Sequence, residues 1–217
     1  MENKTELQPY SVLMSVYSGE KPEFFAQSLE SLYTQTYPAD EIVVVCDGEL
    51  NEQLDGVLEQ YSKKFGGKLK IHRLESHGGT AKCANTGLAI CKNEYIMKMD
   101  SDDICLENRA EKQMTYLAQH PEVSILGSYI QEFDSNTGND IAVRKPPTEN
   151  EAIRKFAKRR APFNNQTLVY KKSLALSIGG YCEELERCED YDFMVRMLIG
   201  GAIAANIPDC LLYTSDA

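Results

Sequence analysis

The residues of this 217-residue chain most suited to chemistry are three aspartates within four positions, in the stretch YIMKMDSDDICL (95–106). Asp100 and Asp102 are two residues apart, so in an extended conformation both carboxylates project to the same side. Carboxylate oxygens suit Mg²⁺ or Mn²⁺, and Mg²⁺ is usually held by one or two carboxylates together with substrate phosphates. The pair therefore predicts a divalent-cation site, whereas Asp103 is better explained as a helix cap or first-turn charge.

An EF-hand and a phosphatase site fit this acidic stretch less well. An EF-hand loop starting at Asp100 would need glycine at its sixth position, where Cys105 stands. A phosphatase-type nucleophilic aspartate could also follow a strand, but the rest of the chain lacks the accompanying pattern. The formal net charge of −10 argues against nucleic acid as a partner, because binding to its phosphates relies on clustered lysine and arginine. A bridging cation would still let an acidic chain bind a diphosphate.

The residues before the aspartates alternate between strand and helix patterns. YSVLMSVY (10–17) and EIVVVCD (41–47) are apolar and β-rich, and a helical pattern of apolar residues lies between them. The alternation continues with a helix at about 51–65, the strand KLKIHRL (68–74), a helix at 79–91 and the strand EYIMKM (94–99). A fully apolar run such as IVVV implies cover on both faces, hence a parallel sheet with right-handed crossovers. Ligands bind at the carboxyl ends of such strands, where Asp100 stands.

The second half of the chain predicts a mixed sheet. Apolar residues at 106, 110, 114 and 117 indicate a helix that Pro121 ends, before the strand VSILGSYI (123–130). The turn-rich SNTGND (135–140) then predicts a hairpin. We expect a single α/β domain over residues 1–217, with a change in architecture but no linker near residue 130.

Composition and the chain start indicate a cytoplasmic protein, with contact at the inner face of the membrane as an option. No run approaches the ~18 apolar residues of a membrane span, and MENKTELQPY lacks the features of a signal peptide. The seven cysteines include no CxxC pair and no Cys/His cluster at zinc spacing. We therefore expect buried, reduced thiols.

Taken together, five motifs make the chain resemble family-2 glycosyltransferases of the GT-A fold over about residues 10–213. They are VYSG, IVVVCDGE, GGTAKCANTGL, MDSDD and CEDYDFMVR. The resemblance implies a Rossmann-like, mainly parallel sheet flanked by helices, with a nucleotide-binding half at about 10–130 and an acceptor-binding half at about 131–213. It implies metal-dependent, inverting transfer from a nucleotide-diphosphate sugar, preferably a UDP-sugar, to a carbohydrate or lipid-linked acceptor in polysaccharide or glycolipid synthesis. It also implies more chain beyond residue 217.

The resemblance assigns donor-binding roles by position. Ser15 and Tyr17 would lie against the nucleotide, although polar residues at a strand end are also ordinary. Asp47 would hydrogen-bond the base, with a turn before Gly48 as the plainer reading of Asp-Gly. Lys82 would meet the nucleotide, although a helical lysine is more often solvated. Asp100 would contact the ribose and the metal through water, and Asp102 would coordinate the Mg²⁺ or Mn²⁺ ion directly.

For the acceptor side, the resemblance assigns Asp190 as general base, although acids in a first helical turn are also favoured by the dipole. Glu189 would orient loops or acceptor, and Arg196 would form a structural ion pair or support the site. Asn85 would join neighbouring loops. Asn165 stands where related chains often have histidine, so a direct metal or phosphate ligand from that segment is doubtful.

A basic segment and two alternative functions stay open. KFAKRRAPF places Lys155, Lys158, Arg159 and Arg160 at a helix end, where a solvated face or weak attraction to anionic lipid would account for them. A sugar-nucleotide nucleotidyltransferase would need a glycine- and arginine-rich phosphate loop that VYSGEKPE lacks. A non-catalytic sugar-nucleotide or glycan-binding module is the alternative from outside the enzymes.

Overall fold

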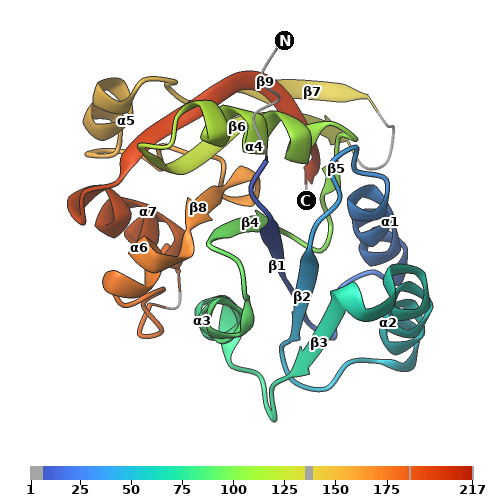
Figure 1. The fold of residues 1–217 in the computed structure, drawn as a ribbon. Coiled ribbons are helices and arrows are strands. Elements are labelled where there is room, and N and C mark those ends of the chain that lie inside the picture. Colours follow the sequence, from blue (N-terminus) through green and yellow to red (C-terminus); the bar gives the residue numbers. More distant parts are fainter. Residues whose placement is uncertain (1–6, 135–138, 186, 217) are drawn as a thin grey trace.

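A computed structural model describes residues 7–134, 139–185 and 187–216 of the chain. Its strands form one nine-stranded sheet in the order β3-β2-β1-β4-β8-β6-β9-β5, with β7 paired to β6. Figure 1 shows helices on both sides of this sheet. The fold is therefore α/β with a mixed sheet.

The first half follows the predicted alternation. Its parallel strands are β1 (Tyr10–Val16), β2 (Glu41–Cys46), β3 (Leu69–Arg73) and β4 (Tyr95–Met99). Between them come α1 (Pro22–Tyr33), α2 (Glu52–Phe65), a 3₁₀ turn η1 (Gly66–Lys68) and α3 (Gly79–Ile90). Every residue of β2 is buried, which confirms the prediction that the IVVV run is covered on both faces.

Two hydrophobic cores lie on the two faces of the sheet. Helices α1 and α2 contribute Phe25, Leu29, Leu54 and others to the first core, and α3 contributes Ala81, Ala84 and Leu88 to the second. Alternation along β1 sends Val12 and Met14 to the first core and Leu13 to the second. In Figure 1, α1 and α2 lie on one side of β1 to β3, and α3 lies on the other.

The second half is mixed, as predicted. Its strands are β5 (Ile104–Cys105), β6 (Val123–Asp134), β7 (Asp140–Arg144), β8 (Val169–Lys171) and β9 (Ile203–Asp216). Its helices are α4 (Arg109–Gln119), α5 (Asn150–Phe156), α6 (Lys172–Ser177) and α7 (Glu189–Ile199), with a 3₁₀ turn η2 (Asn165–Thr167). β8 runs antiparallel to β4 and β6, while β6 and β9 are parallel.

Three details differ from the sequence prediction or extend it. Leu106 precedes α4 instead of belonging to it. β6 continues to Asp134, across the proposed boundary near residue 130, and pairs antiparallel with β7 as a hairpin would. The predicted turn at 135–140 lies mostly outside the described residues. In the described part of the chain, no helix has both the length and the apolar character to cross a bilayer.

The prediction that all seven cysteines are buried is wrong for three of them. All seven are free thiols, and Cys46, Cys83, Cys91 and Cys105 are buried. Cys188 is exposed, and Cys182 and Cys210 are partly exposed. The buried four lie on or beside elements that pack against a core, and Cys182 and Cys188 belong to the loop before α7. Cys210 lies on β9, where the neighbouring Leu211 and Leu212 make the core contacts.

Candidate active site

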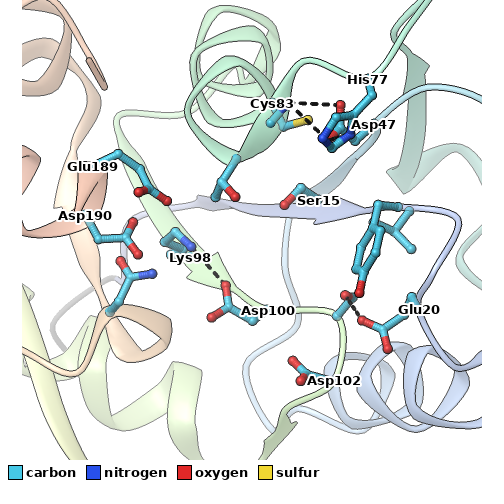
Figure 2. A pocket seen from close by; sticks show the side chains of 16 residues that line it. Ser15, Glu20, Asp47, His77, Cys83, Lys98, Asp100, Asp102, Glu189 and Asp190 are labelled. Carbon is cyan, nitrogen blue, oxygen red and sulfur yellow. Dashed lines mark hydrogen bonds and ion pairs between the residues drawn. The ribbon is translucent and has the colours of Figure 1, made fainter. Parts of the chain in front are cut away.

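A pocket of about 630 Å³ opens where β1, β2 and β4 end and the N-terminus of α7 approaches them. Six of the seven residues predicted to bind donor, bind metal or act as base line this pocket; Lys82 does not. The lining consists of Ser15, Val16, Tyr17, Glu20, Asp47, His77, Gly79, Thr80, Cys83, Lys98, Asp100, Ser101, Asp102, Asn165, Glu189 and Asp190. Figure 2 shows these side chains directed towards a common space.

Asp100 is fixed by contacts at both its backbone and its side chain. Its carboxylate accepts a hydrogen bond from the Lys98 ammonium at 2.9 Å, and its backbone carbonyl accepts one from the Ser28 hydroxyl at 3.0 Å. Ser28 is buried on α1, so that helix holds the loop after β4. The carboxylate itself remains 37% exposed, enough to contact a ligand.

Lys98 is the main functional candidate that sequence reasoning missed. Its side chain is 7% exposed, and in Figure 2 it lies between Asp100 and Asp190. Burial alone would lower the pKa of this ammonium, but the carboxylates of Asp100 and Asp190 outweigh burial and raise the pKa, so Lys98 stays charged. A signal was present, because a lysine inside the buried run YIMKM needs a charged partner.

Asp102 and Glu20 add negative charge on the other side of Asp100. Burial raises the pKa of Asp102, and the nearby charges of Glu20 and Asp100 raise it further. Among the described residues, no hydrogen bond to Asp102 is found beyond that from its own backbone N–H. The Ser101 hydroxyl donates to Glu20, which brings the loop after β1 against the acidic loop. The sequence did not identify Glu20 as a site residue, because glutamates are common in short polar loops.

These carboxylates fit a cation that is shared with a substrate. Within the part of the chain that the structure describes, no group of three or more His, Cys, Asp or Glu could enclose a metal ion alone. Burial first, and then the charges of Glu20 and Asp100, raise the pKa of Asp102, and a bound cation would offset both effects. Mg²⁺ typically takes one or two carboxylates plus phosphate oxygens, and the Asp100–Asp102 pair meets that requirement.

Asp103 is not a helix cap, contrary to the prediction. Helix α4 starts after Asn108, five residues further on. Asp103 is buried, and its side chain hydrogen-bonds to Thr214 of β9. Burial, together with Asp100, raises the pKa of Asp103 to about 8. The segment is a turn and not the extended chain that the sequence suggested, because the Asp103 N–H donates to Asp100 O. Asp100, Ser101 and Asp102 therefore all line the pocket, while Asp103 faces β9.

At the end of β2, Asp47 organises the start of α3. Its carboxylate accepts hydrogen bonds from the backbone N–H groups of Gly78, at 2.6 Å, and Gly79, at 3.1 Å, and lies 2.7 Å from His77 Nδ1. The Gly79 N–H is shared between both carboxylate oxygens, and the Cys83 thiol also hydrogen-bonds to Asp47, so a ligand N–H would have to compete with these donors. Lys82 is exposed, and its aliphatic chain passes over Gly78, outside the pocket lining.

The opposite side of the pocket is formed by α7. Glu189 and Asp190 occupy its first turn, after Cys188 in a left-handed conformation with φ 64°. Burial raises the pKa of Asp190 to about 6; Lys98 opposes this rise, and Asp100 and Glu189 add to it. The Asp190 Oδ1 and Asn165 Oδ1 atoms are both buried without a partner in the described residues. Two orphaned acceptors in one pocket indicate a ligand that donates hydrogen bonds.

Contacts around α7 confirm the structural roles predicted for Asn85 and Arg196. The Asn85 amide donates to Tyr181 O and Glu183 Oε1, both at 2.9 Å, and accepts from Tyr181 N. Arg196 pairs with Asp192 at 2.6 Å and donates to Ile178 O. These bonds tie α7 and the loop before it to α3 and α6, so Asp190 rests on a fixed support.

The chain is similar to several known proteins. The profile of the glycosyl transferase family 2 matches residues 11–176. The amylovoran biosynthesis glycosyltransferase AmsE of Erwinia amylovora is 41% identical over 203 residues, which cover 94% of this chain and 74% of that protein. An Escherichia coli UDP-Gal:alpha-D-GlcNAc-diphosphoundecaprenol beta-1,3-galactosyltransferase is 32% identical, over 94% of this chain and 72% of its own length.

A solved structure shares the fold. Residues 1–349 of Staphylococcus aureus TarS, in complex with UDP, superpose with a TM-score of 0.77 at 22% identity. The match covers 96% of this chain and 61% of the solved chain. The chain therefore spans about three quarters of the curated relatives and about three fifths of this solved one, and it has the GT-A architecture.

Proposed function

The chain belongs to glycosyl transferase family 2 and is a glycosyltransferase, and on that premise we propose that it moves one sugar from a UDP-sugar to a hydroxyl group of a carbohydrate or lipid-linked acceptor. The observation that carries this proposal is that one pocket holds both the acidic loop after β4 and the Asp190 carboxylate, whose buried Oδ1 atom has no partner among the described residues. The names of the two curated relatives favour a step in polysaccharide or glycolipid synthesis. The reaction would occur in the cytoplasm, at the inner face of the membrane where the acceptor is lipid-linked.

Donor binding is assigned to the strand ends. Ser15 and Tyr17 after β1, Asp47 after β2 and Asp100 after β4 would contact the nucleotide. Asp102, with Asp100 beside it, would hold a Mg²⁺ or Mn²⁺ ion that stabilises negative charge on the diphosphate as a Lewis acid. Lys82 remains a weaker member of this set, because it is exposed and lies outside the pocket lining.

Asp190 acts as general base in the proposed reaction. The acceptor oxygen attacks the anomeric carbon while its proton passes to the Asp190 carboxylate. The bond from the anomeric carbon to the diphosphate oxygen breaks, and the diphosphate leaves with the electron pair. Attack from the side opposite the leaving group inverts the anomeric centre.

Lys98 interacts with both the proposed metal-binding side of the pocket, at Asp100, and the proposed base, Asp190. Its ammonium holds Asp100 at 2.9 Å, and its charge opposes the rise in the pKa of Asp190. At neutral pH an Asp190 pKa of about 6 leaves the base ionised yet basic enough to accept a proton in the transition state.

The test is release of nucleoside diphosphate from a panel of nucleotide sugars, with and without Mn²⁺. We expect at least one UDP-sugar to be hydrolysed slowly in the presence of Mn²⁺ and transferred faster when an acceptor is added. Proton NMR of the product would establish the anomeric configuration. UDP binding without turnover of any donor would instead identify a binding module.

A further inference from the structure

We propose that the surface formed by Lys155, Phe156, Lys158, Arg159 and Arg160, here called the α5 basic surface, docks on an anionic phospholipid bilayer. The inference rests on the proposed function in one respect: docking would present a lipid-linked acceptor to Asp190.

The charge of the chain is unevenly distributed along the sequence. The net charge is −10, yet residues 152–182 contain seven lysines and arginines and no aspartate or glutamate. Five of the seven lie between Arg154 and Arg160. An anionic surface would therefore be attracted by this segment and repelled by most of the rest, which fixes the orientation of approach.

The four cations of the α5 basic surface have no ion-pair partner in the part of the chain that the structure describes. All four side chains are exposed, and none forms an ion pair with any residue in the described ranges. Arg154 differs, because it donates to the carbonyls of Leu198 and Ala202. The helix dipole accounts for one or two cations at the end of α5. It does not account for Arg159 and Arg160, which follow the helix.

The same surface is hollow and partly apolar. Lys155, Phe156 and the three later cations border an open depression of about 650 Å³, together with Pro147 and Ala152. Phe156 is 37% exposed and stands between the basic residues in the sequence. An aromatic ring among basic side chains suits the boundary between lipid headgroups and acyl chains, where the ring is buried and the cations meet phosphate.

The position of α5 connects this surface to the active site. The Tyr191 hydroxyl donates to Ala157 O at 2.6 Å, and Tyr191 directly follows the proposed base. Arg154 contacts the other end of α7 at Leu198 O, so α5 lies along α7 with its basic end towards Asp190. Figure 1 shows α5 beside α7 at the edge of the molecule. A bilayer bound here would lie beside the acceptor side of the pocket.

Vesicle co-sedimentation of the full chain tests the proposal. The vesicles are pure phosphatidylcholine or phosphatidylcholine with phosphatidylglycerol, at low and high salt. Each basic residue near an anionic membrane strengthens binding by roughly fivefold, so Lys158→Ala with Arg159→Ala should weaken binding by about 30-fold. The matched control is Lys63→Ala with Lys112→Ala, which removes the same charge from exposed ion pairs elsewhere.

The expected result is salt-sensitive binding to phosphatidylglycerol vesicles that the α5 variant loses and the control keeps. Equal binding by both variants, or no binding by the wild type, overturns the proposal. Wild-type binding to an acidic polysaccharide in place of vesicles also overturns it. UDP-sugar hydrolysis in solution should be the same in wild type and the α5 variant. Absence of hydrolysis in the wild type would count against the proposed function and not against docking.

Discussion

At the scale of single residues, the pocket combines groups whose charges work against one another. Asp100 repels both Asp102 and Asp190, and Lys98 is the buried cation placed between Asp100 and Asp190. Burial raises the pKa values of Asp102 and Asp190, whereas Lys98 stays protonated because the carboxylates of Asp100 and Asp190 outweigh the effect of burial on its ammonium. A ligand that brings a cation and a hydrogen-bond donor would relieve this repulsion, so such a ligand should bind most favourably.

Asp190→Asn should separate binding from chemistry. The amide keeps the size of the side chain but cannot take a proton, so transfer should fall by about 10²–10⁴-fold. UDP affinity should change less than about threefold, which corresponds to roughly 0.6 kcal/mol. Steady-state kinetics and calorimetry with UDP measure the two effects. Wild-type turnover by this variant would remove Asp190 from the role of base.

The same residue predicts a dependence of stability on pH. Its folded pKa of about 6 exceeds its ordinary value of 3.8, so the folded state binds more protons than the unfolded state between these values. The contribution of Asp190 to stability is therefore present below pH 3.8 and is lost as the pH rises through 6. Asp190→Asn should raise the unfolding free energy by on the order of 1–3 kcal/mol at pH 7 and much less at pH 4. Thermal unfolding of both proteins at both pH values measures this difference, and an equal shift at both would refute the link.

Lys98→Met should change the pH profile of the reaction. Without the ammonium, nothing opposes the burial and the carboxylate charges that raise the pKa of Asp190. The acidic limb of the rate profile should move to higher pH, so the loss of activity at pH 6 should exceed that at pH 8.5. Lys63→Met, which alters an exposed pair on α2, is the control. A uniform loss at all pH values would indicate that Lys98 affects binding or folding alone.

At the scale of elements, α3 reaches the sheet only because its inner face is made of small residues. A Cβ on Gly87 would lie 2.1 Å from Leu13 Cδ1 and 3.2 Å from Val45 Cγ2. Gly56, inside α2, has nothing within 4 Å of the same position. Gly87→Ala and Gly56→Ala both gain helix propensity, so the difference in stability between the two variants isolates the effect of packing at Gly87.

Gly87→Ala should be roughly 1–3 kcal/mol less stable than Gly56→Ala, because overpacking forces side chains of both strands to shift. The displacement would also move Gly78 and Gly79 at the start of α3, which donate to Asp47. Urea denaturation gives the stability difference, and UDP affinity reports the change at the pocket. Equal stability of the two variants would show that the sheet accommodates the methyl group.

The elements were more predictable than the contacts between them. Hydrophobic periodicity located β1 to β4, α2 and α3 within a residue or two and placed a helix between β1 and β2, because the pattern of each element is imposed by the core that it faces. Asp103 shows why the contacts were less predictable. Its local sequence suggests a helix cap, but its hydrogen bond is to Thr214 of β9, over a hundred residues later in the chain. The Glu20–Ser101 contact likewise joins two loops that only the assembled sheet brings together.

At the scale of the whole molecule, a net charge of −10 opposes the binding of a diphosphate, and a divalent cation reverses that effect locally. Binding of UDP and of Mn²⁺ should therefore be coupled, with each strengthening the other by the same factor. Ligands that bind only the folded state stabilise it by about 2.7 kcal/mol at 100 times their Kd, which for this size corresponds to a rise in Tm of roughly 5–11 °C. We expect UDP with Mn²⁺ to raise the Tm by more than the sum of the two separate effects. Asp102→Asn should abolish this extra rise in Tm and keep the small rise that UDP causes without Mn²⁺. A strictly additive rise in the wild type would show that no cation is shared between this pocket and the diphosphate.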